Sequence, residues 1–335
     1  MSEDRAPHLT RGRLMVVTDL HGDWATYLRL RELFFHHRAR GEADRLVLCG
    51  DVVHAPPHIQ PDCSYDILQD ILMLRQTYGD NLITVLCGNH EMPHIYDLMF
   101  TRDHQHLPLN APLEQRISQH DRDGSARFRR PQLHAFFMQM PFYLTTDAGV
   151  MLSHAGAPPF AGENGWYDVL RVFDHQALID RGSDRLQAFT LWRFWRDRAY
   201  REQAQQLLAV EDEKDPRFFN LLRGQLLMEH EPLMRLLWDA LFLRNEYGYP
   251  LAQYLRDVAL MLEQASRHVP VPQRFLVAGH VVVDEGHAAL GEQKLRFASG
   301  VHAKPVSQAV YLLFDAAEPI ADMPQLVSKL RRVWA

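Results

Sequence analysis

Short apolar runs, each ending abruptly at a glycine or a polar residue, constrain the fold of this chain more than any other feature of its sequence. Five such runs lie at residues 14–17, 46–49, 82–87, 150–152 and 275–278. Continuous apolar runs of this length are typical of strands buried on both faces. Helical patterns lie between several of them, from Trp24 to about Arg40 behind a capping Asp23, and from a capping Ser64 to Gly79. Strands that alternate with helices predict a layered α/β protein.

Composition excludes several classes of protein. Of 335 residues, 47% are apolar and 23% are charged, which is enough for a large core and rules out a disordered chain. The net charge of −6 argues against a basic nucleic-acid binder, so no nucleic-acid duplex is expected as a partner. Three cysteines are too few for a disulfide framework and indicate a reducing compartment. Residues 1–13 lack a signal-peptide pattern and no apolar run approaches about 18 residues, so we expect a cytoplasmic protein without a membrane partner.

The pattern changes from about residue 182 to residue 268, where helical spacing continues without a strand-like run. We interpret about 182–268 as a helical insertion, or cap, within a single domain that spans residues 1–335. A smaller helical segment is expected at about 93–137. After residue 305 the sequence predicts a last strand at 309–314 and a terminal helix near 323–334.

Polar side chains follow the predicted strands directly. They are Asp19 and His21, then Asp51, then Asn89 and His90, then His154, and finally His280. Because ligand sites in open α/β sheets form at the carboxyl ends of strands, we expect these side chains to converge. Taken singly, an aspartate here is explained as a helix cap and a histidine as a satisfied core residue. The succession of five such strand ends instead favours a site for divalent transition metals.

The same residues, taken in order, resemble the calcineurin-like metallophosphoesterases. The motifs are Asp-Leu-His at 19–21, Gly-Asp at 50–51, Gly-Asn-His-Glu at 88–91, His-Ala-Gly at 154–156 and Gly-His at 279–280. The resemblance covers about residues 14–315, apart from the helical insertion, and the Gly-Asn-His-Glu motif is its most specific part. It implies a four-layer α/β fold, a two-sheet β-sandwich flanked by helices, with two divalent metal ions (Mn, Fe or Zn) at one edge.

The resemblance also implies a role for each residue. Asp19, His21 and Asp51 would hold the first metal. Asp51 would bridge to the second metal, which Asn89, His154 and His280 would complete. His90 would act as the general acid, its alternative being a structural histidine beside the metals. Two such metals clamp the phosphoryl oxygens and supply a bridging hydroxide at neutral pH, so the resemblance implies hydrolysis of phosphate esters.

Two details concern the branch of the family. Members that cleave phosphodiesters often carry Gly-His-x-His in the last motif, whereas this chain has Val282 there. The motifs look more like the phosphoprotein phosphatases and their relatives, the symmetrical diadenosine tetraphosphatases. We therefore predict a Ser/Thr phosphoprotein phosphatase-like enzyme whose partner is a phosphorylated protein or small molecule. The alternatives are a diadenosine-polyphosphate or other nucleotide hydrolase, which the His-Ala-Gly motif weakly favours, and a weakly active metal-holding scaffold.

The second motif departs from that branch, which usually reads Gly-Asp-x-x-Asp-Arg-Gly. Residues 50–56 here read Gly-Asp-Val-Val-His-Ala-Pro, so His54 and Ala55 replace the usual aspartate and the phosphate-binding arginine. His54 is a candidate to bind phosphate, with a plain loop residue as the alternative. The resemblance also implies a second phosphate-binding arginine after a Leu-Leu-Trp stretch, which makes Arg244 a candidate for catalysis and substrate binding. Arg193 and Arg196 compete for that role, although each is also explained as a solvated helix arginine.

Overall fold

Two stacked β-sheets form the centre of the protein. In the computed structural model the described residues are 4–98, 110–243, 246, 248 and 250–334. The five-stranded sheet has the order β13 (Leu330–Arg332), β12 (Val310–Asp315), β2 (Arg13–Val17), β3 (Arg45–Leu48), β4 (Ile83–Val85). The six-stranded sheet has the order β1 (His8–Leu9), β5 (Tyr143–Thr146), β6 (Val150–Ser153), β7 (Phe275–Ala278), β10 (Lys294–Phe297), β9 (His287–Leu290). A short pair joins β8 (Val283–Asp284) and β11 (Ala303–Lys304).

Alternation along the strands explains why the two sheets stack. Successive side chains of a strand point to opposite faces of its sheet. Leu14 and Val16 of β2 belong to one buried cluster with Leu152 and Val277 of the other sheet. Met15, between them, belongs to a second cluster that includes the buried side chains of the helices. Both faces of β2 are therefore buried, as the continuous apolar run predicted.

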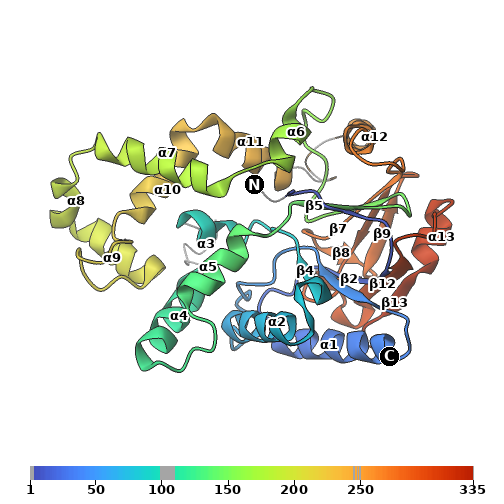
Figure 1. The fold of residues 1–335 in the computed structure, drawn as a ribbon, viewed down its shortest axis with the longest axis horizontal. Helices are drawn as coiled ribbons and strands as arrows, with labels where there is room; N and C mark the ends of the chain where they lie inside the picture. The colour runs from blue at the N-terminus through green and yellow to red at the C-terminus, as the bar shows by residue number, and fades with distance from the viewer. Residues whose placement is uncertain (1–3, 99–109, 244–245, 247, 249, 335) are drawn as a thin grey trace.

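Helices cover the outer faces of the sandwich, which gives four layers (Figure 1). On one side lie α1 (Trp24–Ala39) and α2 (Ser64–Tyr78), and on the other α12 (Leu251–Ser266) contacts β7. Asp23 caps α1 as predicted, because its carboxylate accepts from the backbone N–H groups of Ala25 and Thr26. The predicted cap of α2 is wrong. Ser64 is the first residue of that helix, and the Asp62 carboxylate accepts its backbone N–H.

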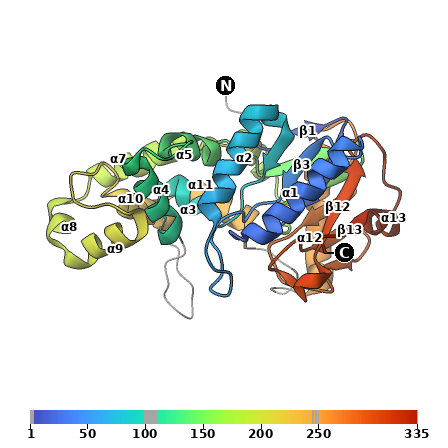
Figure 2. The ribbon, with the colours of Figure 1, turned by 90° about the horizontal axis from the view of Figure 1, so that it is seen from below.

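Two helical stretches interrupt the strands. Between β4 and β5 lie α3 (Met92–Tyr96), α4 (Ala111–Asp123) and α5 (Arg130–Met138). Between β6 and α12 lie α6 (Trp166–Arg171), α7 (His175–Gln187), α8 (Trp192–Arg196), α9 (Arg198–Leu208), α10 (Asn220–His230) and α11 (Pro232–Leu241). In Figures 1 and 2, α7–α10 extend to one side of the sandwich, with α4 and α5 near them. Of the helices in the described ranges, none has the length and apolar composition that crossing a membrane requires.

The end of the chain differs from its prediction. A terminal helix was expected near 323–334, but α13 (Met323–Ser328) is short and is followed by β13. β13 pairs antiparallel with β12, placing Leu330 opposite Leu312. The physical reason is that β12 would otherwise form the sheet edge, where its N–H and C=O groups would lack partners. Strand pairing therefore outweighs the helical spacing of the sequence.

Candidate metal centre

The carboxyl ends of several strands meet at one edge of the sandwich. β2, β3 and β4 are mutually parallel in one sheet, and β6 and β7 are parallel in the other. The residues that follow these strands are therefore brought together. Three groups of side chains could each hold a cation, with their ligand atoms within 4.8 Å of one another: Asp19, His21 and His302; His21, Asp51 and His90; Asp51, His154 and His280.

His154 shows that one group is arranged for a cation. Its Nδ1 lies 2.8 Å from the carbonyl oxygen of Cys49, which can only accept, so Nδ1 carries the proton and Nε2 carries a lone pair. That Nε2 lies 2.9 Å from Asn89 Oδ1 and 3.4 Å from Asp51 Oδ2. His280 Nδ1 lies 3.0 Å from His154 Nε2. Lone pairs that face one another in this way fit ligands around a metal ion, and the backbone bond orients the ring for it.

His21 and His302 belong, with Asp19, to another group that could hold a cation. His21 Nε2 is buried, lacks a hydrogen-bond partner among the described residues, and lies 3.7 Å from Asp51 Oδ2. His302 Nδ1 is likewise buried without such a partner in the described part of the chain, 3.4 Å from Asp19 Oδ1. A buried nitrogen without a partner is costly, and a bound cation would remove that cost.

The electrostatics of the site favour cations. Burial raises the pKa of Asp51 well above its usual range, and the nearby carboxylates of Glu91 and Asp19 raise it further. Bound cations reverse this effect, because they compensate the clustered negative charge. Burial lowers the pKa of His21 to about 3 and that of His154 to about 4. Both imidazoles are therefore neutral at pH 7, which is the form that binds a metal.

The backbone at these positions is strained. Four candidate ligands have positive φ angles, in the left-handed region that residues other than glycine rarely adopt. The angles are 48° for Asp19, 46° for His21, 52° for Asp51 and 75° for His280. Such strain is concentrated at functional sites, where the surrounding structure holds it in place. Here the Asp19 carboxylate accepts the backbone N–H of His280 at 2.9 and 3.0 Å, which ties the two sheets together at the candidate centre.

Comparison with known proteins shows to which protein family the chain belongs. The family model of the calcineurin-like phosphoesterases matches residues 12–210. The chain belongs to this family. It is therefore a metal-dependent phosphoesterase, and its two-sheet sandwich flanked by helices is the fold expected for a calcineurin-like phosphoesterase. No curated protein matches the chain.

Solved structures of three phosphatases align with this phosphoesterase. A protein serine/threonine phosphatase from Saccharomyces cerevisiae aligns over 99% of this chain and 84% of its own, with 13% identity and a TM-score of 0.47. A cold-active protein-tyrosine phosphatase from a psychrophilic Shewanella aligns over 93% of this chain and 79% of its own, with 13% identity and a TM-score of 0.43. A putative diadenosine tetraphosphatase aligns over 47% of this chain and 56% of its own, with 21% identity and a TM-score of 0.28.

Glu91 organises the loops of this phosphoesterase, a role that sequence reasoning missed. Its buried carboxylate accepts the backbone N–H groups of Asp51, Val52 and Gly88 at 2.9, 2.8 and 2.9 Å. The loops that follow β3 and β4 are thereby held against each other. Gly88 has to be a glycine here, because a Cβ would lie 2.6 Å from Glu91 Oε2. The spacing of Gly88 and Glu91 within one motif was the available signal.

His302 is the candidate ligand that sequence reasoning missed entirely. It lies in the loop between β10 and β11, and its ring centroid is 4.8 Å from that of His21. The sequence offered only its position two residues after Gly300 as a signal. Its contact with Asp19 depends on how the two sheets stack, which no local spacing reveals.

We expect His302→Ala to weaken the binding of one metal ion at least about tenfold. Loss of a group that only orients a metal ligand already lowers metal affinity by about this factor, and loss of a ligand itself should lower it at least as much. The affinity is measured by titrating manganese into chelator-treated protein in a calorimeter. His58→Ala, at an exposed loop position, is the control and should bind metal as the wild type does. An unchanged affinity in His302→Ala would remove His302 from the ligand set.

His90 and His54 lie next to each other beside the candidate ligands. His90 Nε2 is 3.9 Å from Asp51 Oδ2, and its side chain is 14% exposed. His54 is buried, with its Nδ1 3.1 Å from His90 Nδ1 and its Nε2 2.8 Å from His94 Nε2. Both ring nitrogens of His54 thus face other histidines. The position of His54 therefore does not support the predicted contact with phosphate.

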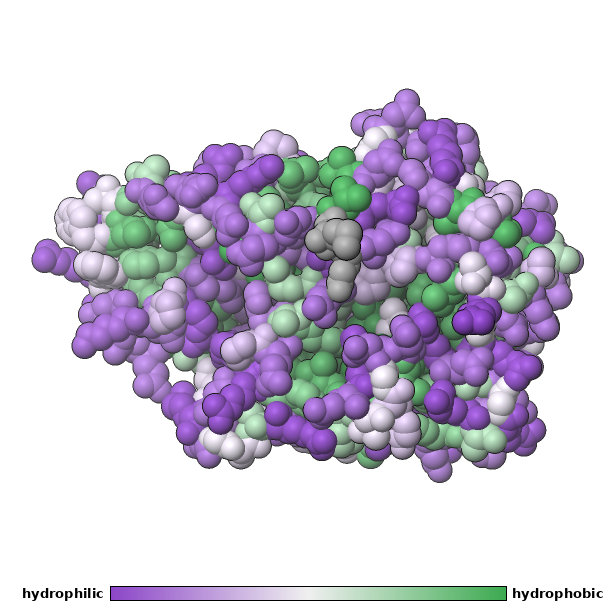
Figure 3. Space-filling view, in the orientation of Figure 1, coloured by the Kyte–Doolittle hydropathy of each residue, from purple (hydrophilic) through white to green (hydrophobic). Residues whose placement is uncertain are grey.

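The predicted substrate arginines are not brought to the candidate centre. Arg193 and Arg196 lie on α8, 5.8 and 5.7 Å from the ring of Trp192. In Figures 1 and 2, α8 stands at the far end of the molecule from the two sheets. Figure 3 shows apolar side chains gathered near this end, and Trp192 and Trp195 are exposed there. Arg244 lies outside the described residues.

Proposed function

We propose that this phosphoesterase hydrolyses phosphate monoesters at a centre of two divalent metal ions, as a Ser/Thr phosphoprotein phosphatase-like enzyme. The observation that supports this most directly is the position of Asp51. Asp51 belongs to two of the candidate groups, one with His21 and one with His154, and its Oδ2 lies 3.7 Å from His21 Nε2 and 3.4 Å from His154 Nε2. A carboxylate between two groups of ligands is suited to bridge two cations, because it offers two oxygens and a full charge.

Each cation has a set of candidate ligands. Asp19, His21, Asp51 and His302 would hold the first cation. The second would be held by Asp51 together with Asn89, His154 and His280. When bound, two divalent cations polarise the phosphoryl oxygens and lower the pKa of the attacking water.

His90 is the group proposed to protonate the leaving oxygen. It directly follows Asn89, so it is close to the ligands, and its side chain is partly open to substrate. Burial, together with the neighbouring His21 and His54, lowers the pKa of His90 well below its usual range. The negative charge of a bound phosphate opposes this shift and favours the protonated ring.

We predict that protein purified without chelator binds two metal ions per chain. The reason is that the candidate ligands fall into separate groups, and Asp51 belongs to one group with His21 and to another with His154 and His280. Elemental analysis after reconstitution with manganese measures the stoichiometry, which should be near two. A value below one would contradict the two-metal proposal, whatever the activity.

The substrate class is tested by comparing three esters on the same metal-loaded protein. A phosphoserine peptide, a diadenosine polyphosphate and an aryl phosphate differ in leaving group and in size. We expect the peptide and the aryl phosphate to be hydrolysed faster than the dinucleotide. Preferential cleavage of the dinucleotide would assign a nucleotide hydrolase instead, and no turnover of any ester would leave only a metal-holding scaffold.

A further inference from the structure

A continuous row of side chains leads from His90 to a buried carboxylate. His90 Nδ1 lies 3.1 Å from His54 Nδ1, and His54 Nε2 lies 2.8 Å from His94 Nε2. His94 Nδ1 in turn lies 2.7 Å from Glu114 Oε1. His54, His94 and Glu114 are only 1%, 5% and 4% exposed, so water does not replace these contacts. The row joins residues from the loops after β3 and β4 to helices α3 and α4.

We propose that His54, His94 and Glu114 form a relay of hydrogen bonds that positions the imidazole of His90 and fixes which of its ring nitrogens faces the candidate metal centre. This inference rests on the proposed function, in which His90 protonates the leaving group. His54, His94 and Glu114 are positioning residues, because they act through His90 and do not touch the substrate.

The carboxylate fixes the direction of every hydrogen bond in the relay. Glu114 can only accept when ionised, so His94 donates from Nδ1. Its Nε2 then carries a lone pair and accepts from His54 Nε2. His54 Nδ1 in turn accepts from His90 Nδ1, which leaves His90 Nε2 to carry the transferable proton. Each contact of the relay thus has one donor and one acceptor, without a conflict between neighbouring rings.

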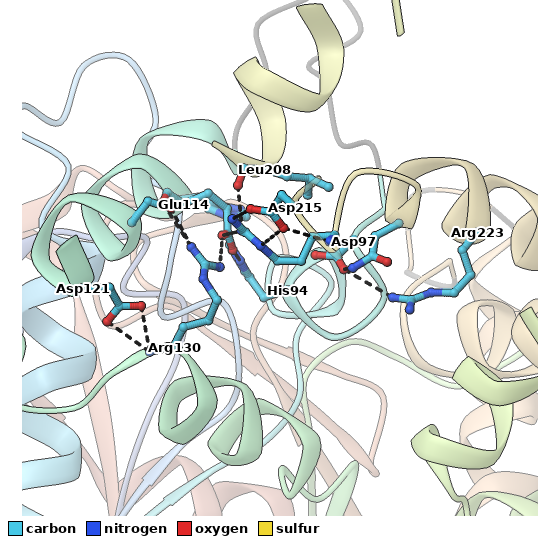
Figure 4. A network of polar contacts seen from close by, with 12 residues as sticks. His94, Asp97, Glu114, Asp121, Arg130, Leu208, Asp215 and Arg223 are labelled. Atoms are coloured by element: carbon cyan, nitrogen blue, oxygen red, sulfur yellow. Dashed lines mark hydrogen bonds and ion pairs between the residues drawn. The ribbon is translucent and has the colours of Figure 1, made fainter. Parts of the chain in front are cut away.

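Glu114 is held in the ionised state at the far end of the relay (Figure 4). Arg130 of α5 pairs with Glu114 Oε2, and its other terminal nitrogen donates to Ser118 at 2.8 Å. Burial by itself raises the pKa of Glu114, but the hydrogen bond from His94 and the charge of Arg130 lower it to about 2. The relay therefore ends in a fixed negative charge at neutral pH. The charge fixes His94 as a donor and so sets the direction of the whole relay.

The backbone of His54 holds its ring between His90 and His94. His54 adopts a φ of 67°, and its backbone N–H donates to Ser64 Oγ at 2.8 Å, which holds the ring between His90 and His94. A neutral imidazole at this position transmits orientation but adds no charge.

The first test compares Glu114→Gln with the wild type on an alkyl phosphate and on 4-nitrophenyl phosphate. Glutamine keeps the shape, but its amide can donate as well as accept and therefore no longer fixes the direction of the relay. We expect a loss of roughly tenfold on the alkyl phosphate, below the roughly 10²–10⁴-fold of a full general acid, and a smaller loss on the nitrophenyl ester, whose leaving group needs little protonation. Metal content should not change. Equal losses on both esters, or loss of a metal, would overturn the relay.

Arg116→Gln is the matched control. Arg116 lies on the same helix as Glu114 and forms an ion pair with Asp66 at 2.8 Å, outside the relay. We expect it to leave both rates unchanged. If it changed the two rates as Glu114→Gln does, the effect would belong to the packing of α4 and the relay would be refuted.

A second test moves the charge next to His90. In a His54→Asp background the new carboxylate can accept from His90 directly, so His90 no longer depends on the row that ends at Glu114. Glu114→Gln should then change the rate by less than twofold. A merely structural role of Glu114 predicts the same loss in both backgrounds, since independent effects add. Wild-type protein that hydrolyses neither ester would refute the proposed function. Wild-type activity that Glu114→Gln leaves unchanged would refute only the relay.

The wild-type protein alone gives a further readout, which does not depend on any variant folding. Nitrogen NMR of ¹⁵N-histidine-labelled protein reports which ring nitrogen carries the proton. The relay requires the proton of His94 on Nδ1 and that of His54 on Nε2. The opposite tautomer at His54 would overturn it.

Discussion

Replacing Asp51 by asparagine is expected to reduce hydrolysis to the background rate. The Oδ2 atom of Asp51 faces His21 and His154 at 3.7 and 3.4 Å, and an amide at this position would bring no negative charge to compensate two cations. Its Oδ1 also accepts the backbone N–H of His90 at 3.0 Å, so the substitution disturbs His90 as well. Initial rates with an aryl phosphate and metal analysis of the same sample measure the effect.

The control for this experiment is Asp66→Asn, which removes a carboxylate on α2 that pairs with Arg116 and not with the candidate ligands. It should keep both metals and wild-type turnover. If Asp51→Asn itself kept two metals and wild-type turnover, Asp51 would not be the bridging ligand and the proposed two-metal geometry would be wrong.

Replacing His90 by alanine should keep both metals and lower turnover by roughly 10²–10⁴-fold, the range for loss of a general acid. The loss should be larger for an alkyl phosphate than for a nitrophenyl phosphate, because the nitrophenolate leaves without protonation. Because the carboxylate of Glu114 reaches His90 only through His54 and His94, we expect a value in the lower part of that range. Turnover of the two esters and metal stoichiometry are measured on one preparation.

The geometry also allows an opposite result. His21, Asp51 and His90 form one of the groups whose ligand atoms lie within 4.8 Å. If His90→Ala lost a metal, or slowed both esters equally, His90 would be a ligand or a structural residue. His134→Ala, which removes a partly buried histidine that contacts the backbone of Ile95, serves as a control for loss of an imidazole near α3.

Local sequence patterns predicted the core strands and most of the candidate ligands for the same reason. A strand buried on both faces requires a continuous apolar run, and the polar residue that ends the run is also the residue at the sheet edge. Asp19, Asp51 and His154 could therefore be located by their order along the chain. The same local rule failed at the C-terminus, because β13 exists only through its pairing with β12.

What the sequence determined by itself is the set of strands and the short polar motifs that follow them, because strand burial and metal ligation both depend on neighbouring residues. Tertiary structure alone decided which distant side chains meet. His302 reaches Asp19 only because the two sheets stack, and Glu114 reaches His54 through His94 only because α4 packs near α3. Contacts of this kind join residues tens to hundreds of positions apart, and no local period encodes them. The helical region likewise carried Arg193 and Arg196 away from the sheet edge, although their sequence alone made them candidates.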